Sequence, residues 1–592
     1  MTDQKPNPTS TRSKSIPQKT ERTWLLRLLA GISSAAYCVI LFLSTEFTVN
    51  NPPSDRPIVL VMSLFGFLFA IYVLAVLVAT KVKQNSRLVL LIIAAAVVFR
   101  IPMLFSTPIQ EVDIYRYMWD GIVSAQGISP FRYPPQAVMS ANSQDFRDRE
   151  LRELASLRDR QPAIAEVLRR VHFRELPTIY PATSQAVFYC AAVATPVDAS
   201  LTTRLLIMKA SLIAFDLATL FLVIKLLSLA RMPIGLSILY GWCPLVMKEV
   251  ANSGHLDAIA VFLCTLSVYL IARLFFSEQS ALQNRVKFHA NLILVALVLA
   301  AAVGAKLYPV VLAPLILFGT ARRFGWKTVG APIVAFSLAT FFLLNPMLPP
   351  QFRLDKRTAA ATESGEANST GASNPDQPAA NDPSRGVTAF FKSWEMNDFV
   401  FMILVENLKP TANNQSNQPV WFSVFPEELR QSIATAVARW FSIPAAEAPF
   451  SAPFLLTRIV TTLAFLCIAL FLAWKASKHQ SMALVCEAAF LTLAWFWLLL
   501  PTQNPWYWLW ALPLLPFARN RAWIAISGLV LVYYLRFWLD YCFANIDVLG
   551  TGYRGTAFFD FVVTWIEFAP WFLWLTIEYF RKDDSAKTDC AA

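Results

Sequence analysis

The chain has 592 residues, of which 56% are hydrophobic and 15% are charged, and its mean hydropathy is +0.48. Soluble domains carry about 25% charged residues, so this composition excludes an ordinary soluble globular domain. The net charge of +12 does not indicate nucleic-acid binding, because the basic residues lie in short loops between apolar stretches, a pattern that orients proteins in membranes.

The apolar stretches predict membrane-spanning helices, because each is near the ~20 residues that cross a hydrocarbon core. A helix is the form that satisfies every backbone polar group inside lipid. The sequence thus predicts an all-α polytopic bundle of about 14 spans. In chain order they cover residues 24–44, 57–80, 87–105, 203–229, 234–249, 256–276, 288–305, 307–319, 328–347, 453–474, 481–501, 505–518, 522–540 and 560–580.

Two long segments separate groups of spans, residues 106–202 and 349–452. Within the first, residues 146–176 place apolar side chains at helical spacing amid dense charge, which predicts a helix on the membrane surface. Residues 183–196 are apolar but short, and we expect a surface or re-entrant helix that does not cross. In the second segment, residues 357–386 contain no aromatic residue and are predicted to be a disordered insert.

Lysine and arginine are distributed unevenly between the two sides of this arrangement. With the basic N-terminus in the cytoplasm, the short loops on that side hold 24 of them and the short outside turns hold four, Arg56, Lys248, Lys306 and Arg554. Both termini are therefore assigned to the cytoplasm, and both long loops to the outside. The predicted parts are a cytoplasmic tail at 1–23, a membrane module at 24–348, the external loop at 349–452, further spans at 453–580 and a tail at 581–592.

Polar and aromatic residues gather on the predicted external face, whereas the cytoplasmic loops hold plain basic residues. Polar groups at membrane depth are costly and are usually functional. Carboxylates accept hydroxyl protons, cations bind phosphate, and flat rings stack on sugars, so such a group suits carbohydrate chemistry. The candidates are Glu111, Asp113, Tyr115, Arg116, Asp120, His255, Asp257, Lys306, Tyr308, Gln503, Asn504, Trp506 and Tyr507.

Plainer interpretations of these residues stay open at this stage. His255 and Asp257 also fit a pair of helix-capping residues at the start of a span. Lys306 also fits a lysine whose long side chain reaches the membrane interface. Residues 504–507 fit a turn within an aromatic belt. Arg100 and Asp216 lie inside apolar stretches and are left out of the site, as possible structural partners.

The segment 110–135 contains an acidic pair one residue apart, then a tyrosine, then Gly-x-Ser-Pro-aromatic-x-Tyr. It resembles glycosyltransferases of the class C membrane fold, in particular bacterial polyprenyl-phosphate-mannose-dependent mannosyltransferases. It is more distantly similar to the eukaryotic enzyme that adds the first mannose of the glycosylphosphatidylinositol anchor. The sequences at 254–257, 306–309 and 505–507 recur in that order in the bacterial family, so the resemblance covers roughly residues 101–516.

The resemblance implies an inverting transfer of a hexose, with mannose expected, from a polyprenyl-phosphate donor to a glycan or glycolipid acceptor. The enzyme would lie in the cell membrane with its active site on the extracytoplasmic face, where membrane lipid surrounds it. Asp113 or Glu111 would act as base, and Lys306, helped by Arg116 or His255, would neutralise the leaving phosphate. The eukaryotic relatives have Asp-x-Asp where this chain has Glu111-Val112-Asp113. We therefore leave the choice of base open, and predict no metal and no cofactor.

Two other functions fit part of the pattern. A transporter or flippase of a lipid-linked or anionic solute would explain the many spans, but transporters tend to have repeats and binding sites at the membrane midplane. A ligase or polymerase of surface polysaccharide would share much of the chemistry. Release of polyprenyl phosphate, as opposed to uptake without turnover, separates an enzyme from a transporter.

Overall fold

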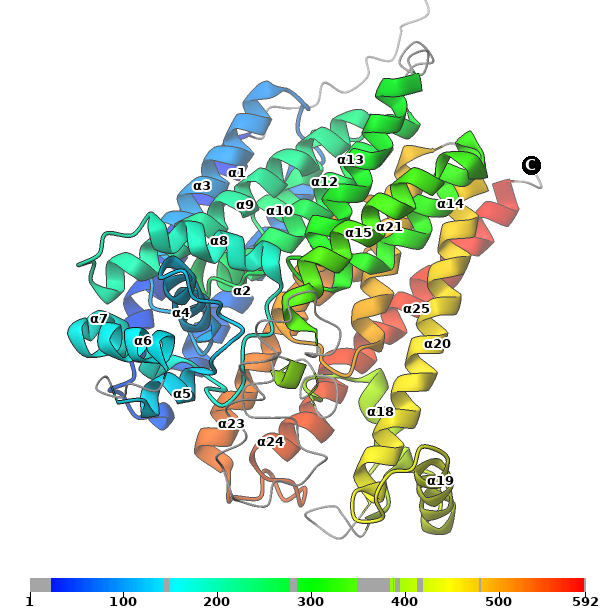
Figure 1. The fold of residues 1–592 in the computed structure, drawn as a ribbon. Helices are drawn as coiled ribbons and strands as arrows, with labels where there is room; N and C mark the ends of the chain where they lie inside the picture. Colours follow the sequence, from blue (N-terminus) through cyan, green and yellow to red (C-terminus); the bar gives the residue numbers. More distant parts are fainter. Residues whose placement is uncertain are drawn as a thin grey trace, which may run out of the picture.

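The computed structural model of the chain is a bundle of long helices with short helices gathered at one end (Figure 1). It contains no β-strand among the described residues, only two isolated bridges. The residues that the structure describes are 23–142, 148–276, 285–348, 384–386, 388, 394–411, 419–478 and 481–589.

Eleven helical segments of this described part are long and apolar enough to cross a membrane. They are α1 (Thr23–Ser44), α2 (Ile58–Ala79), α3 (Ser86–Phe105), α9 (Leu201–Leu229), α12 (Asp257–Phe275), α13 (Arg285–Val303), α15 (Gly330–Leu344), α20 (Ala448–Lys478), α21 (Met482–Leu499), the run of α22 (Ala522–Leu529) and α23 (Leu535–Phe543), and the run of α24 (Gly555–Phe558) and α25 (Thr564–Asp589). The protein is therefore a polytopic helical membrane protein.

The predicted number of spans was too high, because three predicted spans take other forms. Residues 234–252 form a broken pair of helical segments, bent by 42°, which raises the count to twelve if the pair is one span. Residues 307–319 fold as a 3-10 turn and the short helix α14 (Ala313–Phe324), and residues 505–518 as two 3-10 helices. Prolines lie inside or at the start of each of these segments, and proline removes a helical hydrogen bond.

The short helices α4 (Asp113–Ala125), α5 (Pro135–Ser140), α6 (Arg149–Arg160) and α7 (Pro162–Arg170) lie at the lower end of the bundle in Figure 1. The predicted amphipathic helix over 146–176 is thus two helices, because Pro162 begins a new one. Their buried apolar side chains are Leu154, Ala155, Ile164, Val167 and Leu168.

Helix α8 (Ala182–Val193) corresponds to the apolar stretch 183–196, and its 12 residues are fewer than the ~20 of a spanning helix. It packs against α4. Contact is so close that a Cβ atom on Gly121 would lie 2.4 Å from the carbonyl oxygen of Phe188. The two helices therefore meet through a small residue, which fixes how α4 is presented to the bundle.

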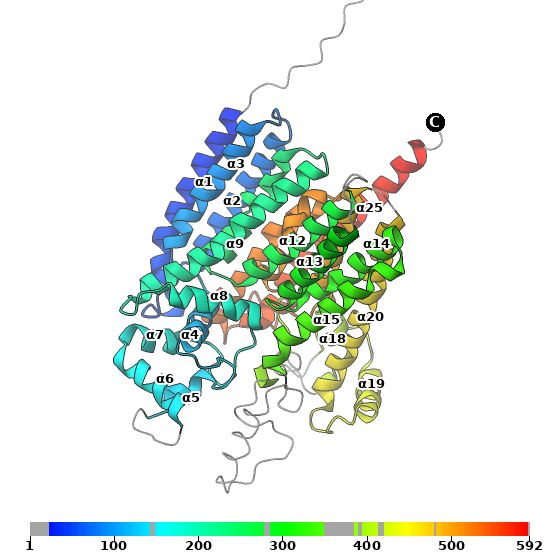
Figure 2. The same cartoon turned by 45° about the horizontal axis from the view of Figure 1, so that its top comes forward.

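The second long loop contributes α18 (Val400–Leu408) and α19 (Glu427–Trp440), which lies at the lower end of α20 in Figure 1. Residues 357–383 of the predicted insert lie outside the described residues, as does the tail at 1–22. The start of α1 and the end of α25 lie at the end of the bundle opposite α5–α7 (Figure 2). This agrees with termini on one side and loops on the other, while the side itself remains a prediction.

The buried ion pair of Arg100 and Asp216 confirms a structural partnership inside the bundle. Arg100 Nη2 donates to Asp216 Oδ1 at 3.0 Å, and the Tyr240 hydroxyl donates to the same oxygen at 2.8 Å. Both charged side chains are almost completely buried. The pair joins α3 to α9 and to the broken segment that follows α9.

Candidate functional site

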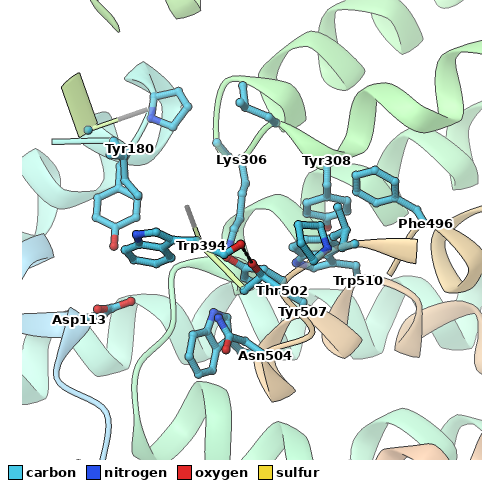
Figure 3. A pocket seen from close by; sticks show the side chains of 18 of the residues that line it. Asp113, Tyr180, Lys306, Tyr308, Trp394, Phe496, Thr502, Asn504, Tyr507 and Trp510 are labelled. Atoms are coloured by element: carbon cyan, nitrogen blue, oxygen red, sulfur yellow. Dashed lines mark hydrogen bonds between the residues drawn. The ribbon is translucent and has the colours of Figure 1, made fainter. Parts of the chain in front are cut away.

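A cavity of about 470 Å³ lies between the start of α4, the loops that follow α7 and α13, the middle of α20 and the loop after α21. In Figure 3 the Asp113 carboxylate and the Lys306 side chain reach this cavity from different walls. Of the thirteen candidates predicted from the sequence, the lining includes Asp113, Arg116, Lys306, Tyr308, Asn504, Trp506 and Tyr507. Segments far apart in the chain thus meet around one space.

Asp113 is the first residue of α4 and is half-buried at the cavity wall. A carboxylate in the first turn of a helix is favoured by the helix dipole, which helps explain why the helix begins there. Glu111, two residues earlier, is buried and does not line the cavity. Burial first, and the Asp113 charge second, raise the pKa of the Glu111 carboxyl well above its ordinary value. Of the two predicted bases, only Asp113 faces the cavity.

Lys306 is held by a buried carboxylate. Its Nζ donates to both carboxylate oxygens of Asp257 at 2.8 Å, and Trp510 Nε1 donates to one of them at 2.6 Å. The Lys306 side chain is 21% exposed and that of Asp257 is 1% exposed, so the cation faces the cavity and the anion lies behind it. Burial lowers the pKa of the Lys306 ammonium, and the Asp257 charge opposes that shift.

Aromatic rings form much of the wall around Lys306. Its Nζ lies 4.3 Å from the centroid of the Tyr507 ring and 5.5 Å from that of Trp510. The Tyr308 and Trp510 rings are stacked at 4.2 Å, and those of Tyr507 and Trp510 at 4.4 Å. Stacking fixes these rings against one another, so this part of the wall is ordered before any ligand enters.

Two further rings reach the cavity from other segments. Tyr180 follows the short helices of the first long loop, and burial raises the pKa of its phenol. Trp394 belongs to the second long loop and packs against Phe173 at 5.0 Å between ring centroids. Both rings are labelled in Figure 3. Each long loop therefore supplies part of the wall.

His255 lies behind the wall and does not line the cavity. Its ring stacks on Trp506 at 4.2 Å, and its Nε2 lies 3.3 Å from Glu249 Oε2. The Tyr534 hydroxyl donates to the same carboxylate at 2.9 Å. Glu249 was missed from the sequence, although its place beside Lys248 in an apolar stretch was a signal. Lys248 itself is fully buried, although it was counted among the cations of the outside turns.

The turn before His255 requires a glycine at position 254. Its φ of +70° lies in the left-handed region, and an added Cβ would lie 2.4 Å from Ile114 Cδ1. Ile114 follows Asp113 directly, so the turn presses against the residue next to the cavity carboxylate. The contact positions the start of α4 relative to the Glu249–His255 turn.

Tyr115, Asp120 and Gln503 are predicted site residues that point into the protein instead. The Tyr115 hydroxyl accepts a hydrogen bond from Arg170 Nη1 at 2.8 Å. Asp120 is 1% exposed and accepts from Arg116 Nε at 2.9 Å. Gln503 Nε2 donates to the Leu498 carbonyl at 2.9 Å, within the loop after α21. Their contacts hold the walls of the cavity together.

The loop after α21 is also paired with the second long loop. The Met396 backbone N–H donates to the Pro501 carbonyl, and the Gln503 N–H donates to the Met396 carbonyl, both at 2.9 Å. Asn397 Nδ2 adds a bond of 3.2 Å to the Gln503 carbonyl. This short parallel bridge joins the two loops, and Trp394 and Asn504, which flank it, both line the cavity.

The apolar part of the cavity is built by the bundle. It includes Val310, Val311, Phe465, Phe496 and Leu499, from the segment after α13 and from α20 and α21. Arg458 of α20 lines the same space, and its signal in the sequence was an arginine inside an apolar stretch. The cavity thus combines charged groups at one part with an apolar surface at another.

No family model, no curated protein and no solved structure matches this chain. The resemblance to class C glycosyltransferases therefore stays a prediction. Within the described ranges, no three His, Cys, Asp or Glu side chains are grouped so that they could hold a metal ion.

Proposed function

We propose that the protein transfers a hexosyl group, with mannose the expected sugar, from a polyprenyl-phosphate donor to a hydroxyl of a glycan or glycolipid acceptor. The observation that carries the proposal is the cavity itself. A carboxylate, Asp113, and a cation, Lys306, face one space whose walls are aromatic on one part and apolar on another. A sugar phosphate on a lipid presents the matching groups: hydroxyls, a flat face, an anion and a hydrocarbon chain.

In this proposal Asp113 is the base. Its carboxylate takes the proton of the acceptor hydroxyl while that oxygen attacks the anomeric carbon. The bond from this carbon to the phosphate oxygen breaks, and polyprenyl phosphate leaves with the electron pair. Attack opposite the leaving group inverts the anomeric configuration. General-base assistance contributes about 10²–10⁴-fold in rate.

Lys306 neutralises the charge that develops on the departing phosphate oxygen. Asp257 holds its ammonium by two hydrogen bonds, so little reorganisation is needed when the charge appears. The apolar part of the cavity, near Phe465 and Val311, accepts the first units of the polyprenyl chain. The extracytoplasmic side of the reaction rests on the distribution of lysine and arginine described above.

The test is transfer by the purified full chain in liposomes, with radiolabelled polyprenyl-phosphate mannose and extracted cell glycolipids as acceptors. Release of polyprenyl phosphate together with labelled glycolipid supports the proposal. Movement of the intact donor across the liposome without cleavage would instead identify a transporter. Addition of a chelator should leave the parent rate unchanged.

Two variants with the same change of charge separate the carboxylates. Asp113→Asn should lower kcat by about 10²-fold or more, the contribution of a general base, with little effect on the donor KM. Glu111→Gln, outside the cavity, is the matched control and should retain most of the turnover. Lys306→Met should raise the donor KM and lower kcat, because phosphate is present in both the ground and the transition state. Near-parent turnover by Asp113→Asn would refute the assignment of the base.

A further inference from the structure

Arg116 lines the cavity, and one nitrogen of its guanidinium has no hydrogen-bond partner. Its side chain is 9% exposed, its Nε donates to Asp120 at 2.9 Å, and its Nη1 donates to the Leu176 carbonyl at 3.1 Å. Its Nη2 is buried and has no hydrogen-bond partner. Arg116 also lines the cavity that contains Asp113 and Lys306. A buried donor of a charged group destabilises the protein when it is left unpaired, so such a group favours a ligand that accepts its hydrogen bond.

The Arg116 guanidinium is held in place by Asp120, whose carboxylate is itself fixed by other hydrogen bonds. Asp120 accepts hydrogen bonds from Thr178 Oγ1 at 2.6 Å and from Gln185 Nε2 at 3.0 Å, besides the bond from Arg116. These contacts fix the Nε edge of the guanidinium and leave Nη2 with protons to donate. The fork geometry of arginine then suits the oxygens of a phosphate group.

Arg116 and Lys306 belong to different walls. Lys306, in the segment after α13, is bound to Asp257 at the start of α12, beside the Tyr507 and Trp510 rings of the loop after α21. Arg116 is bound to Asp120 and Leu176, and its charge acts on the phenol of Tyr180, where it opposes the rise in pKa. Each cation has its own buried carboxylate, so the two cations at the cavity are held by separate sets of contacts.

We propose that Arg116 forms a second anion-binding subsite, distinct from the Lys306 position, which takes a phosphate group carried by the acceptor. The acceptor part rests on the proposed function. Asp113 and Arg116 are three residues apart on α4, and such residues have Cβ atoms about 5–6 Å apart on one helix face. The acceptor's phosphate therefore lies within about one sugar ring of the hydroxyl that Asp113 deprotonates.

The experiment is a titration of the full chain with inorganic phosphate in micelles of dodecyl maltoside, a detergent without phosphate, followed by ³¹P NMR or calorimetry. The parent protein should bind phosphate at two positions. Lys306→Met should remove one and leave the other, a measurement that needs no change at Arg116. In that background Arg116→Lys should weaken the remaining site about tenfold and Arg116→Gln should abolish it, as expected for a charge-assisted hydrogen bond.

Arg149→Gln is the matched control, because that arginine side chain is 83% exposed and lies on α6. It should leave both positions unchanged. Loss of all phosphate binding in Lys306→Met would overturn the proposal, as would a remaining site that Arg116→Lys and Arg116→Gln leave intact.

Nanodiscs that contain phosphatidylglycerol distinguish the source of the phosphate. If a phospholipid headgroup fills the Arg116 position, inorganic phosphate no longer binds there in Lys306→Met; if the phosphate comes on a separate acceptor, binding is unchanged. These measurements involve no turnover. If only the proposed function is wrong, no glycosyl transfer is measured but two phosphate positions are found. If only the subsite proposal is wrong, transfer is measured but a single phosphate position is found.

Discussion

The salt bridge between Asp257 and Lys306 at the cavity wall has a geometry from which its energy can be worked out. Both carboxylate oxygens lie 2.8 Å from Nζ, and Asp257 is fully buried. At an effective dielectric constant of about 20, opposite charges about 3 Å apart attract by about 5 kcal/mol. Removal of one partner of a buried pair costs about 3–5 kcal/mol, because the other charge is left uncompensated. Since Lys306 is partly exposed to the cavity, we expect Asp257→Asn to cost about 3 kcal/mol.

A double-mutant cycle measures this coupling. The free energy of unfolding in mixed detergent micelles would be compared for the parent, Asp257→Asn, Lys306→Met and the double variant. The double variant should be more stable than Asp257→Asn alone, because it no longer buries an unpaired ammonium, and the coupling energy should exceed about 2 kcal/mol. A coupling below about 1 kcal/mol, the range of exposed pairs, would show that Asp257 does not hold Lys306 as described.

Three further substitutions test other contacts. Gly254→Ala should lower the free energy of unfolding by about 1–3 kcal/mol more than Gly127→Ala does. Both glycines have positive φ, but only Gly254 also lies in close contact with α4. Equal losses of unfolding free energy would contradict this packing. Burial raises the pKa of Glu111 above its ordinary 4.5, so its contribution to stability is present below pH ~4.5 and is lost as the pH rises toward the folded pKa. The melting temperature of the parent relative to Glu111→Gln should therefore fall as the pH rises, and a rise would refute the shift. Asp216→Asn should lower the free energy of unfolding by about 3–5 kcal/mol, because it leaves the buried Arg100 unpaired. The double variant Asp216→Leu with Arg100→Leu should lower it much less. Thermal unfolding of the two variants measures the difference.

The membrane class and most of the long helices followed from the sequence alone. An apolar stretch of about 20 residues has one stable form in lipid, so local composition is sufficient. The helical nature of 146–176 and the short helix at 183–196 were likewise visible in spacing and length. The stretch 505–518 was misjudged, because hydropathy does not register the backbone hydrogen bonds that proline removes.

The sequence also indicated which turns contain polar groups, but it left their orientation open. Glu111 and Asp113 are chemically similar and two residues apart, and only the tertiary structure places Asp113 at the cavity and Glu111 in the interior. That difference depends on where α4 begins and on its contact with Gly254, which is more than a hundred residues away. The pairing of Lys306 with Asp257 is similarly long-range. Composition and periodicity describe neighbours along the chain, whereas the partners of a buried charge are chosen by packing between segments that the sequence keeps apart.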